Sequence, residues 1–204
     1  SEDFSDSSWI NARSSVVSNQ AISPSGGLDA YKFFDSTANN SHLLYSTQTT
    51  TIGQKYSFSF FIKKGTITKA FLAHNNGGNQ TVVFDLVNGL VELQGADIDS
   101  SDIVEYTNGW YKCSFTHTAS NTTALYRVGI YSGGVTYAGT GTDYIYIWGA
   151  QFEALPYATS YIPTSGAIAT RLADSVTGAG DATTFNSTEG VLYAEIAALR
   201  EIND

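Results

Sequence analysis

Large apolar residues alternate with other residues along several short segments, and this two-residue period limits the fold more than any other feature. Residues 56 to 62 place Tyr, Phe, Phe and Ile at every second position, with Ser, Ser and Phe between them. Residues 82 to 87, 111 to 117 and 126 to 131 repeat the period. Successive side chains of a β-strand point to opposite faces, so such segments bury one face and leave the other free. The period therefore predicts antiparallel strands.

Two Asn-Gly pairs adjoin these segments and predict tight turns. We expect both residues of Asn88-Gly89 to adopt the left-handed backbone of a hairpin turn that leads into residues 90 to 93. Asn108-Gly109 leads into residues 110 to 118. Short strands joined by polar turns favour an all-β fold, a two-sheet antiparallel β-sandwich. The predicted core consists of Tyr56, Phe58, Phe60, Val82, Phe84, Leu86, Tyr111, Cys113, Phe115, Val128 and Ile130.

The pattern changes twice between residues 144 and 174, which predicts the end of the sandwich. Residues 144 to 152 alternate as a strand does, and place Tyr144, Tyr146, Trp148 and Phe152 on one face. The extension that follows contains prolines, and from residue 165 the sequence is small, polar and without a period.

We predict a β-sandwich over residues 1 to 164 and a linker over residues 165 to 183. Residues 184 to 204 are either the truncated start of a second module or an oligomerisation segment. Residues 191 to 196 fit a strand and residues 192 to 202 fit a helix. We favour a strand that runs into a short turn or helix.

Three motifs near the end of the predicted sandwich carry a resemblance to a known class of modules. They are Trp-Gly-Ala-Gln-Phe-Glu at 148–153, Ser-Tyr-Ile-Pro-Thr at 160–164 and Ala-Thr-Arg-Leu-Ala-Asp at 169–174. The sequence resembles modules of bacteriophage tail and virion-surface proteins, which are jelly-roll sandwiches like the carbohydrate-binding modules. Residues 1 to 9, 51 to 59 and 108 to 112 are similar to other strands of these modules.

The resemblance covers about residues 1 to 174 and implies the jelly-roll connectivity. It also implies a location in the virion, on its tail or surface, or outside the cell. Residues 190 to 195 resemble the first strand of the lectin-like sandwich that often follows such modules. Since the sequence contains no Met and the similarity begins at its first residue, we expect it to be a fragment of a longer protein that stops inside this second module.

Composition argues against several classes of partner. Lys and Arg number 10 against 19 Asp and Glu, and the resulting net charge of -9 repels a nucleic-acid backbone. No apolar run approaches the roughly 20 residues of a membrane-spanning helix, so we expect no membrane insertion. With 1 cysteine the chain forms no internal disulfide, and Cys113 is interpreted as a small core residue.

The sequence lacks the residue patterns of the common hydrolases, so we expect a non-catalytic protein. It contains no Gly-x-Ser-x-Gly motif, and the 3 histidines, His42, His74 and His117, fall in separate segments, where we interpret them as surface or edge-strand side chains. No spacing suits a zinc site, and the Gly-rich turns lack the Lys of a phosphate-binding loop. A pair of carboxylates could hydrolyse a glycoside, but the sequence cannot single one out.

Aromatic side chains on outward strand positions or in loops predict a site for glycans. Sugars offer apolar C–H faces to an aromatic ring and hydroxyl groups to planar or charged hydrogen-bonding groups. Arg127 is the sharpest candidate, since an outward guanidinium beside Tyr131 offers several donors. For each aromatic residue, ordinary core packing is the alternative. The candidates are Phe61, Arg127, Tyr131, Tyr137, Tyr144 and Trp148.

The resemblance also implies a site for a structural calcium ion, because sandwiches of this type often join their first and last strands through a hard cation. The acids available for it are Glu2, Asp3, Asp29 and Glu153.

Together these observations predict a glycan-binding module of a phage tail or virion-surface protein, which contacts host or environmental polysaccharide. Its other expected partners are virion subunits and further copies of the same chain in a homo-oligomer. Two alternatives stay open: a structural or oligomerisation module of a virion protein, and an accessory carbohydrate-binding domain of a polysaccharide-degrading enzyme. The module class rests on the resemblance, since a fold does not fix a function.

Overall fold

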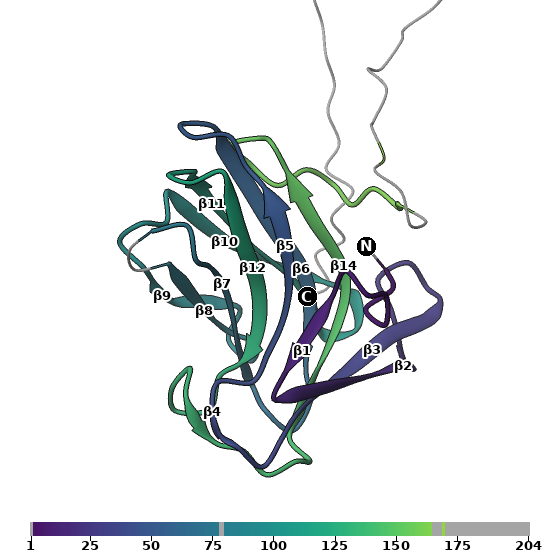
Figure 1. Cartoon of the computed structure of the whole chain (residues 1–204). Helices are drawn as coiled ribbons and strands as arrows, with labels where there is room; N and C mark the ends of the chain where they lie inside the picture. The colour runs from purple at the N-terminus through teal and green to yellow at the C-terminus, as the bar shows by residue number, and fades with distance from the viewer. Residues whose placement is uncertain (1, 78–79, 165–168, 170–204) are drawn as a thin grey trace, which may run out of the picture. The chain divides into compact units, whose positions relative to one another are not determined.

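A computed structural model describes residues 2–77, 80–164 and 169, and in it two large antiparallel sheets pack face to face (Figure 1). Sheet A contains, in spatial order, β1 (Ile10–Ala12), β5 (Leu43–Thr49), β12 (Thr123–Ile130), β7 (Lys69–His74), β8 (Thr81–Asp85) and β9 (Leu90–Gln94). Sheet B contains β10 (Ser100–Tyr106), β11 (Trp110–Thr118), β6 (Lys55–Lys64), β14 (Tyr144–Glu153), β3 (Leu28–Asp35) and β2 (Ser14–Ile22). The predicted two-sheet antiparallel sandwich is confirmed.

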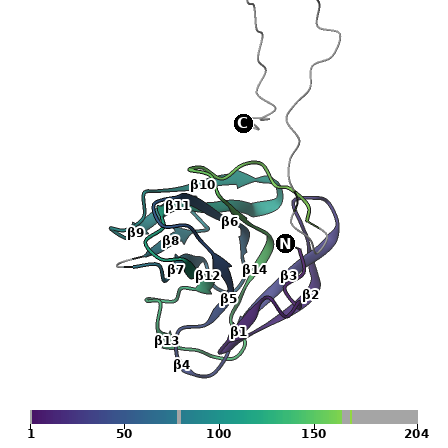
Figure 2. The same cartoon turned by 45° about the horizontal axis from the view of Figure 1, so that its top comes forward.

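A short ribbon of β4 (Asn39–Asn40) and β13 (Tyr137–Ala138) lies beside the sandwich (Figure 2). Within the described ranges, the only helical segment is one 3-10 turn at Thr107–Gly109. These ranges contain no helix that is long and apolar enough to cross a membrane. Apart from Ala169, the predicted linker and the segment 184 to 204 lie outside the described residues, so the division into domains stays a prediction.

The core lies between the sheets and contains every residue that the two-residue period assigned to it. Phe58 and Phe60 project from β6 of sheet B, and Phe84 projects from β8 of sheet A. The amino-terminal segment adds Phe4, whose ring stacks on Phe60 with centroids 5.5 Å apart. Cys113 is fully buried, and burial raises the pKa of its thiol well above the ordinary value, so it packs as a small apolar residue.

The β8–β9 hairpin is confirmed, but its turn differs from the predicted one. Gly89 has a φ of 63°, whereas Asn88 is not among the residues with positive φ. The carboxylate of Asp85 instead accepts hydrogen bonds from the backbone N–H groups of Val87 and Asn88, at 2.8 and 3.1 Å. A side chain that bonds to the turn backbone thus replaces the second left-handed residue.

A β-bulge in β14 overturns the predicted alternation from Tyr144 to Phe152. The pairing of β14 with β6 shifts between Trp148 and Gln151, where Gly149 adopts a φ of 60°. Phe152 consequently points into the core and stacks on Tyr56 at 5.1 Å, whereas Trp148 lies on the outer face. An inserted residue moves every later side chain to the other face of the sheet.

Candidate functional site

The structure distributes the predicted glycan-binding residues over both outer faces of the sandwich. Arg127 and Tyr131 lie on the outer face of sheet A, on β12 and just after it. Phe61, Tyr144 and Trp148 lie on the outer face of sheet B, on β6 and β14. No single site therefore includes all of the predicted residues.

Phe61 and Trp148 are buried, with exposed fractions of 3% and 4%. The ring of Tyr161 covers them, with its centroid 4.5 Å from Trp148 and 6.1 Å from Phe61. The side chain of Gln151 holds the covering segment, since its oxygen accepts a hydrogen bond from the backbone of Ile162 at 2.9 Å. Neither ring offers a face to a ligand in this arrangement, which corresponds to the core-packing alternative.

Tyr144 is half-buried in an aromatic group on the outer face of sheet B. The ammonium of Lys32 lies 3.9 Å from the centroid of its ring, and the rings of Phe34 and Tyr146 lie 5.6 and 5.3 Å away. A cation over an aromatic face is held by the ring quadrupole. Because Lys32 already covers one face of Tyr144, that face is not free for a sugar.

The side chain of Tyr137 packs against other residues of the protein and supports a loop. Its ring lies 4.6 Å from that of His42, and its hydroxyl is 3.4 Å from a carboxylate oxygen of the buried Asp35. Asp35 also accepts hydrogen bonds from the backbone of Thr140 and Asp143, at 2.9 and 3.1 Å. Burial, and then the charge of Asp35, raise the pKa of the Tyr137 phenol. Tyr137 thus helps to hold the loop between β13 and β14.

The outer face of sheet A is built around a glycine inside a strand. Gly129 pairs with Phe71 across the β12–β7 ladder, and a Cβ atom at Gly129 would lie 2.2 Å from the Phe71 ring. The absent side chain therefore makes room for the ring, which packs with Leu43 and Val83. Sequence analysis did not single out Phe71, although a glycine within a strand is a signal of such close packing.

Two pockets open beside this apolar group. The first has a volume of about 420 Å³ and is lined by Thr66, Ile67, Thr68, Lys69, Glu92, Tyr131, Ser132 and Gly133. The second has a volume of about 260 Å³ and is lined by Ser41, Leu43, Phe71, Ala73, His74, Gln80, Thr81, Arg127, Val135 and Thr136. Of the predicted residues, Tyr131 lines the first pocket and Arg127 lines the second.

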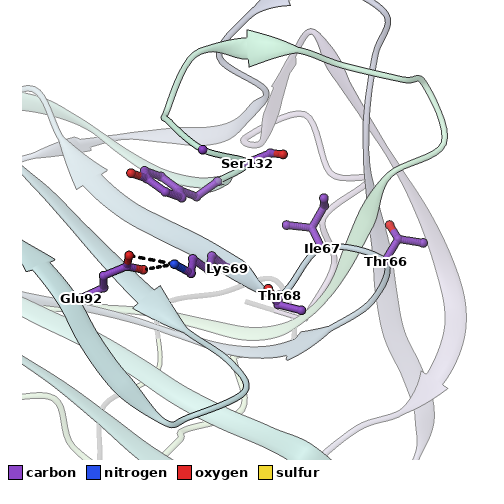
Figure 3. A pocket seen from close by; sticks show the side chains of 8 residues that line it. Thr66, Ile67, Thr68, Lys69, Glu92 and Ser132 are labelled. Carbon is purple, nitrogen blue, oxygen red and sulfur yellow. Dashed lines mark hydrogen bonds and ion pairs between the residues drawn. The ribbon is translucent and has the colours of Figure 1, made fainter.

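The first pocket combines an ion pair with hydroxyl groups. The ammonium of Lys69 lies 2.7 Å from both carboxylate oxygens of Glu92. Figure 3 shows Ser132 across the pocket from this pair, Thr68 next to Lys69, and Thr66 at the far end of the pocket beyond Ile67. Tyr131 is half-buried and adds an aromatic ring to the lining. Apart from Tyr131, the sequence pattern did not identify this set, because its members come from separate strands and loops.

The second pocket contains a guanidinium without a partner. Arg127 is half-buried, its Nε atom is buried without a hydrogen bond, and burial lowers the pKa of the side chain. The hydroxyl-bearing Ser41, Thr81 and Thr136 line the same pocket. Arg127 is thus an unpaired donor within reach of a ligand in this pocket.

The histidines are not surface side chains, which corrects the sequence-based interpretation. His74 and His117 are buried, and their rings stack at 3.9 Å, while Nε2 of His117 is 2.6 Å from the Tyr126 hydroxyl. Burial lowers the pKa of His74 to about 3 and also lowers the pKa of His117. His42 is buried as well, against Tyr137. Strand parity places the rings of His74 on β7 and His117 on β11 inside the sandwich, whereas His42 lies between β4 and β5.

Three of the four acids predicted to bind calcium accept hydrogen bonds from the protein. Glu2 accepts hydrogen bonds from Tyr161 and Thr164, and Glu153 accepts them from Thr159. Asp3 accepts hydrogen bonds from Ser5 and Tyr31, and Asp29 has a buried oxygen without one. Over the described ranges, no group of three or more His, Cys, Asp or Glu residues could hold a metal ion. Calcium binding by these acids stays a prediction.

Comparison with known proteins found solved structures whose folds are similar to that of this chain. No protein-family model and no curated protein matches the sequence. The carbohydrate-binding module TmCBM61, solved in complex with β-1,4-galactotriose, is similar over 73% of this chain and 90% of its own, with 16% identity and a TM-score of 0.42. The enzymatically active domain of tailspike protein 4 from bacteriophage CBA120 is similar over 73% of this chain and 20% of its own, with 10% identity and a TM-score of 0.41.

Proposed function

We propose that this chain is a non-catalytic glycan-binding module, and that its binding surface is the outer face of sheet A. The observation that carries the proposal is the unpaired guanidinium of Arg127 in one pocket, with the ring of Tyr131 in the pocket beside it. An aromatic ring suits the apolar face of a sugar, and a guanidinium suits its oxygens. The resemblance to phage tail and virion-surface modules supports host or environmental polysaccharide as the ligand.

The pockets also suit an extended ligand. Arg127 and Tyr131 are four positions apart, which is about 13 Å along an extended chain. A ligand that contacts both side chains must therefore be longer than one sugar ring. The ion pair of Lys69 and Glu92 offers both donors and acceptors to hydroxyl groups.

A glycan array with the whole chain, followed by calorimetry on the best ligand, tests the proposal. We expect Arg127→Ala and Tyr131→Ala each to weaken binding by about 10-fold or more, because each removes a contact worth roughly 1 to 3 kcal/mol. Tyr144→Ala is the matched control, since it removes an aromatic ring from the opposite face.

The opposite result, with binding lost in Tyr144→Ala and kept in Arg127→Ala, would move the site to sheet B. If no glycan binds across a broad array, the glycan-binding function is wrong. The chain would then be better explained as a structural module of a virion.

A further inference from the structure

Arg127 lacks an acidic neighbour on each adjacent strand. It lies on β12 in the interior of sheet A, and its partners in register are Tyr45 on β5 and Ala73 on β7. Neither can form an ion pair with it, and Ala73 lines the same pocket as Arg127. The guanidinium of Arg127 therefore has no negatively charged cross-strand partner.

The pocket lining also supplies no negative charge. None of the residues that line it is Asp or Glu. The ion pairs found within the described ranges use Lys55 and Lys69, and none uses Arg127. The sequence holds 19 Asp and Glu, so acids are not scarce. A partly buried cation without a counter-ion is unfavourable, and a bound anion removes that penalty.

The neighbouring pocket provides a contrast. There the ammonium of Lys69 is neutralised by Glu92 at 2.7 Å. A balanced ion pair suits uncharged hydroxyl groups, whereas an unpaired guanidinium suits a carboxylate, which it can bind through two parallel hydrogen bonds. The two pockets therefore differ in the charge that they favour in a ligand.

We propose that the Arg127 pocket selects a carboxylate-bearing sugar, so that the ligand is an acidic oligosaccharide with an uncharged unit in the pocket of Lys69 and Glu92. This inference rests on the proposed glycan-binding function and narrows its ligand class. The carboxylate would accept hydrogen bonds from the guanidinium, and the hydroxyl groups of Thr81 and Thr136 lie in the same lining.

Calorimetry with matched ligands tests the selection. The probes are hyaluronan fragments, unsulfated chondroitin fragments and sialyllactose, each of which joins an acidic unit to an uncharged one. Each is paired with its carboxyl-reduced counterpart, in which the acid is a primary alcohol. We expect the unaltered chain to bind one acidic form at least about 10-fold more tightly than its reduced form. Arg127→Gln should remove this preference, and Arg127→Lys should keep part of it, because lysine retains the charge but not the planar fork.

Lys55→Gln is the matched control, since it removes one positive charge from an exposed ion pair on β6 and should leave the preference unchanged. Circular dichroism establishes that each variant is folded. Equal binding of acidic and reduced forms, or a preference that survives in Arg127→Gln, overturns the inference while the glycan-binding function stands. Equally tight binding of polyglutamate also overturns it, because the pocket would then recognise a carboxylate without the sugar. Failure to bind any glycan overturns both proposals.

Discussion

At the scale of single residues, the stacked pair of His74 and His117 has a direct effect on stability. Both rings are buried beside Tyr126, and burial lowers the pKa of each imidazole. The native state therefore binds fewer protons than the unfolded chain, whose histidines titrate near about 6.5. The stabilising effect is fully present above this value and is lost as the pH falls below it.

We predict that the free energy of unfolding is level from pH 8 to pH 7 and decreases from pH 6.5 to pH 5. The slope from His74, whose pKa is lowered to about 3, approaches about 1.4 kcal/mol per pH unit, and His117 contributes in the same direction. Urea unfolding at a series of pH values measures it, and the range above pH 5 avoids most carboxylate titration. His117→Gln should reduce the slope without abolishing it, because His74 still takes up a proton on unfolding. A level profile down to pH 5 would show that the imidazoles take up protons in the folded state.

Aromatic residues on the outer faces have different roles according to which segment covers them. Trp148 and Tyr131 both lie on outer faces, yet Tyr161 covers the first, whereas the second lines a pocket. Parity identifies the face of a strand but not the later segment that packs on it. The predicted glycan residues therefore divide into packed and available ones only in the folded chain.

At the scale of elements, the bulge in β14 decides which side chains face the core. Gly149 provides the left-handed backbone at φ 60°, and a Cβ atom there would lie 3.0 Å from the ring of Phe61 and 3.1 Å from that of Tyr161. Gly53 offers a matched comparison, with a φ of 83° and nothing within 4 Å of its added Cβ. The two positions share the backbone requirement and differ in packing.

We predict that Gly53→Ala lowers the free energy of unfolding by about 1 kcal/mol and that Gly149→Ala lowers it by about 2 to 4 kcal/mol. The first change adds only left-handed strain, whereas the second also forces two aromatic rings apart. Urea unfolding of both variants gives the comparison. Equal destabilisation would mean that the covering segment adjusts to the added methyl group without loss.

At the scale of the whole molecule, the pockets of sheet A lack the groups of a glycosidase. Glu92 is the one acid in their linings, and it is paired with Lys69. Glycoside hydrolysis usually requires two carboxylates on either side of the scissile bond. The thiol of Cys113 and the imidazoles of His74 and His117 are buried; burial raises the pKa of the thiol and lowers the pKa of both imidazoles.

We therefore predict that this chain releases no reducing ends from a broad panel of polysaccharides. A colorimetric assay for reducing sugars measures the release, with a known glycosidase as the positive control. Glu92→Gln should leave this zero rate unchanged. Release that disappears when a single Asp or Glu is neutralised would establish a catalytic carboxylate and contradict the non-catalytic assignment.

The sequence alone determined the sandwich and the composition of its core. The two-residue period assigned Phe58 and Phe84 to the interior, and the Asn-Gly pair located the β8–β9 hairpin, because strand parity and turn preference depend on neighbouring residues. It also selected Arg127 as an outward guanidinium. These properties are local, so the order of residues is enough to predict them.

Only the tertiary structure decided the bulge at Gly149, the cover of Tyr161 over Trp148, the pairing of His74 with His117 and the two pockets of sheet A. Each depends on which distant strands become neighbours. Arg127 lacks a counter-ion because β5 and β7 place Tyr45 and Ala73 beside it. Such pairings are fixed by the packing of the entire sandwich, since the free energy of a strand depends on its cross-strand partners and its burial as much as on its own residues.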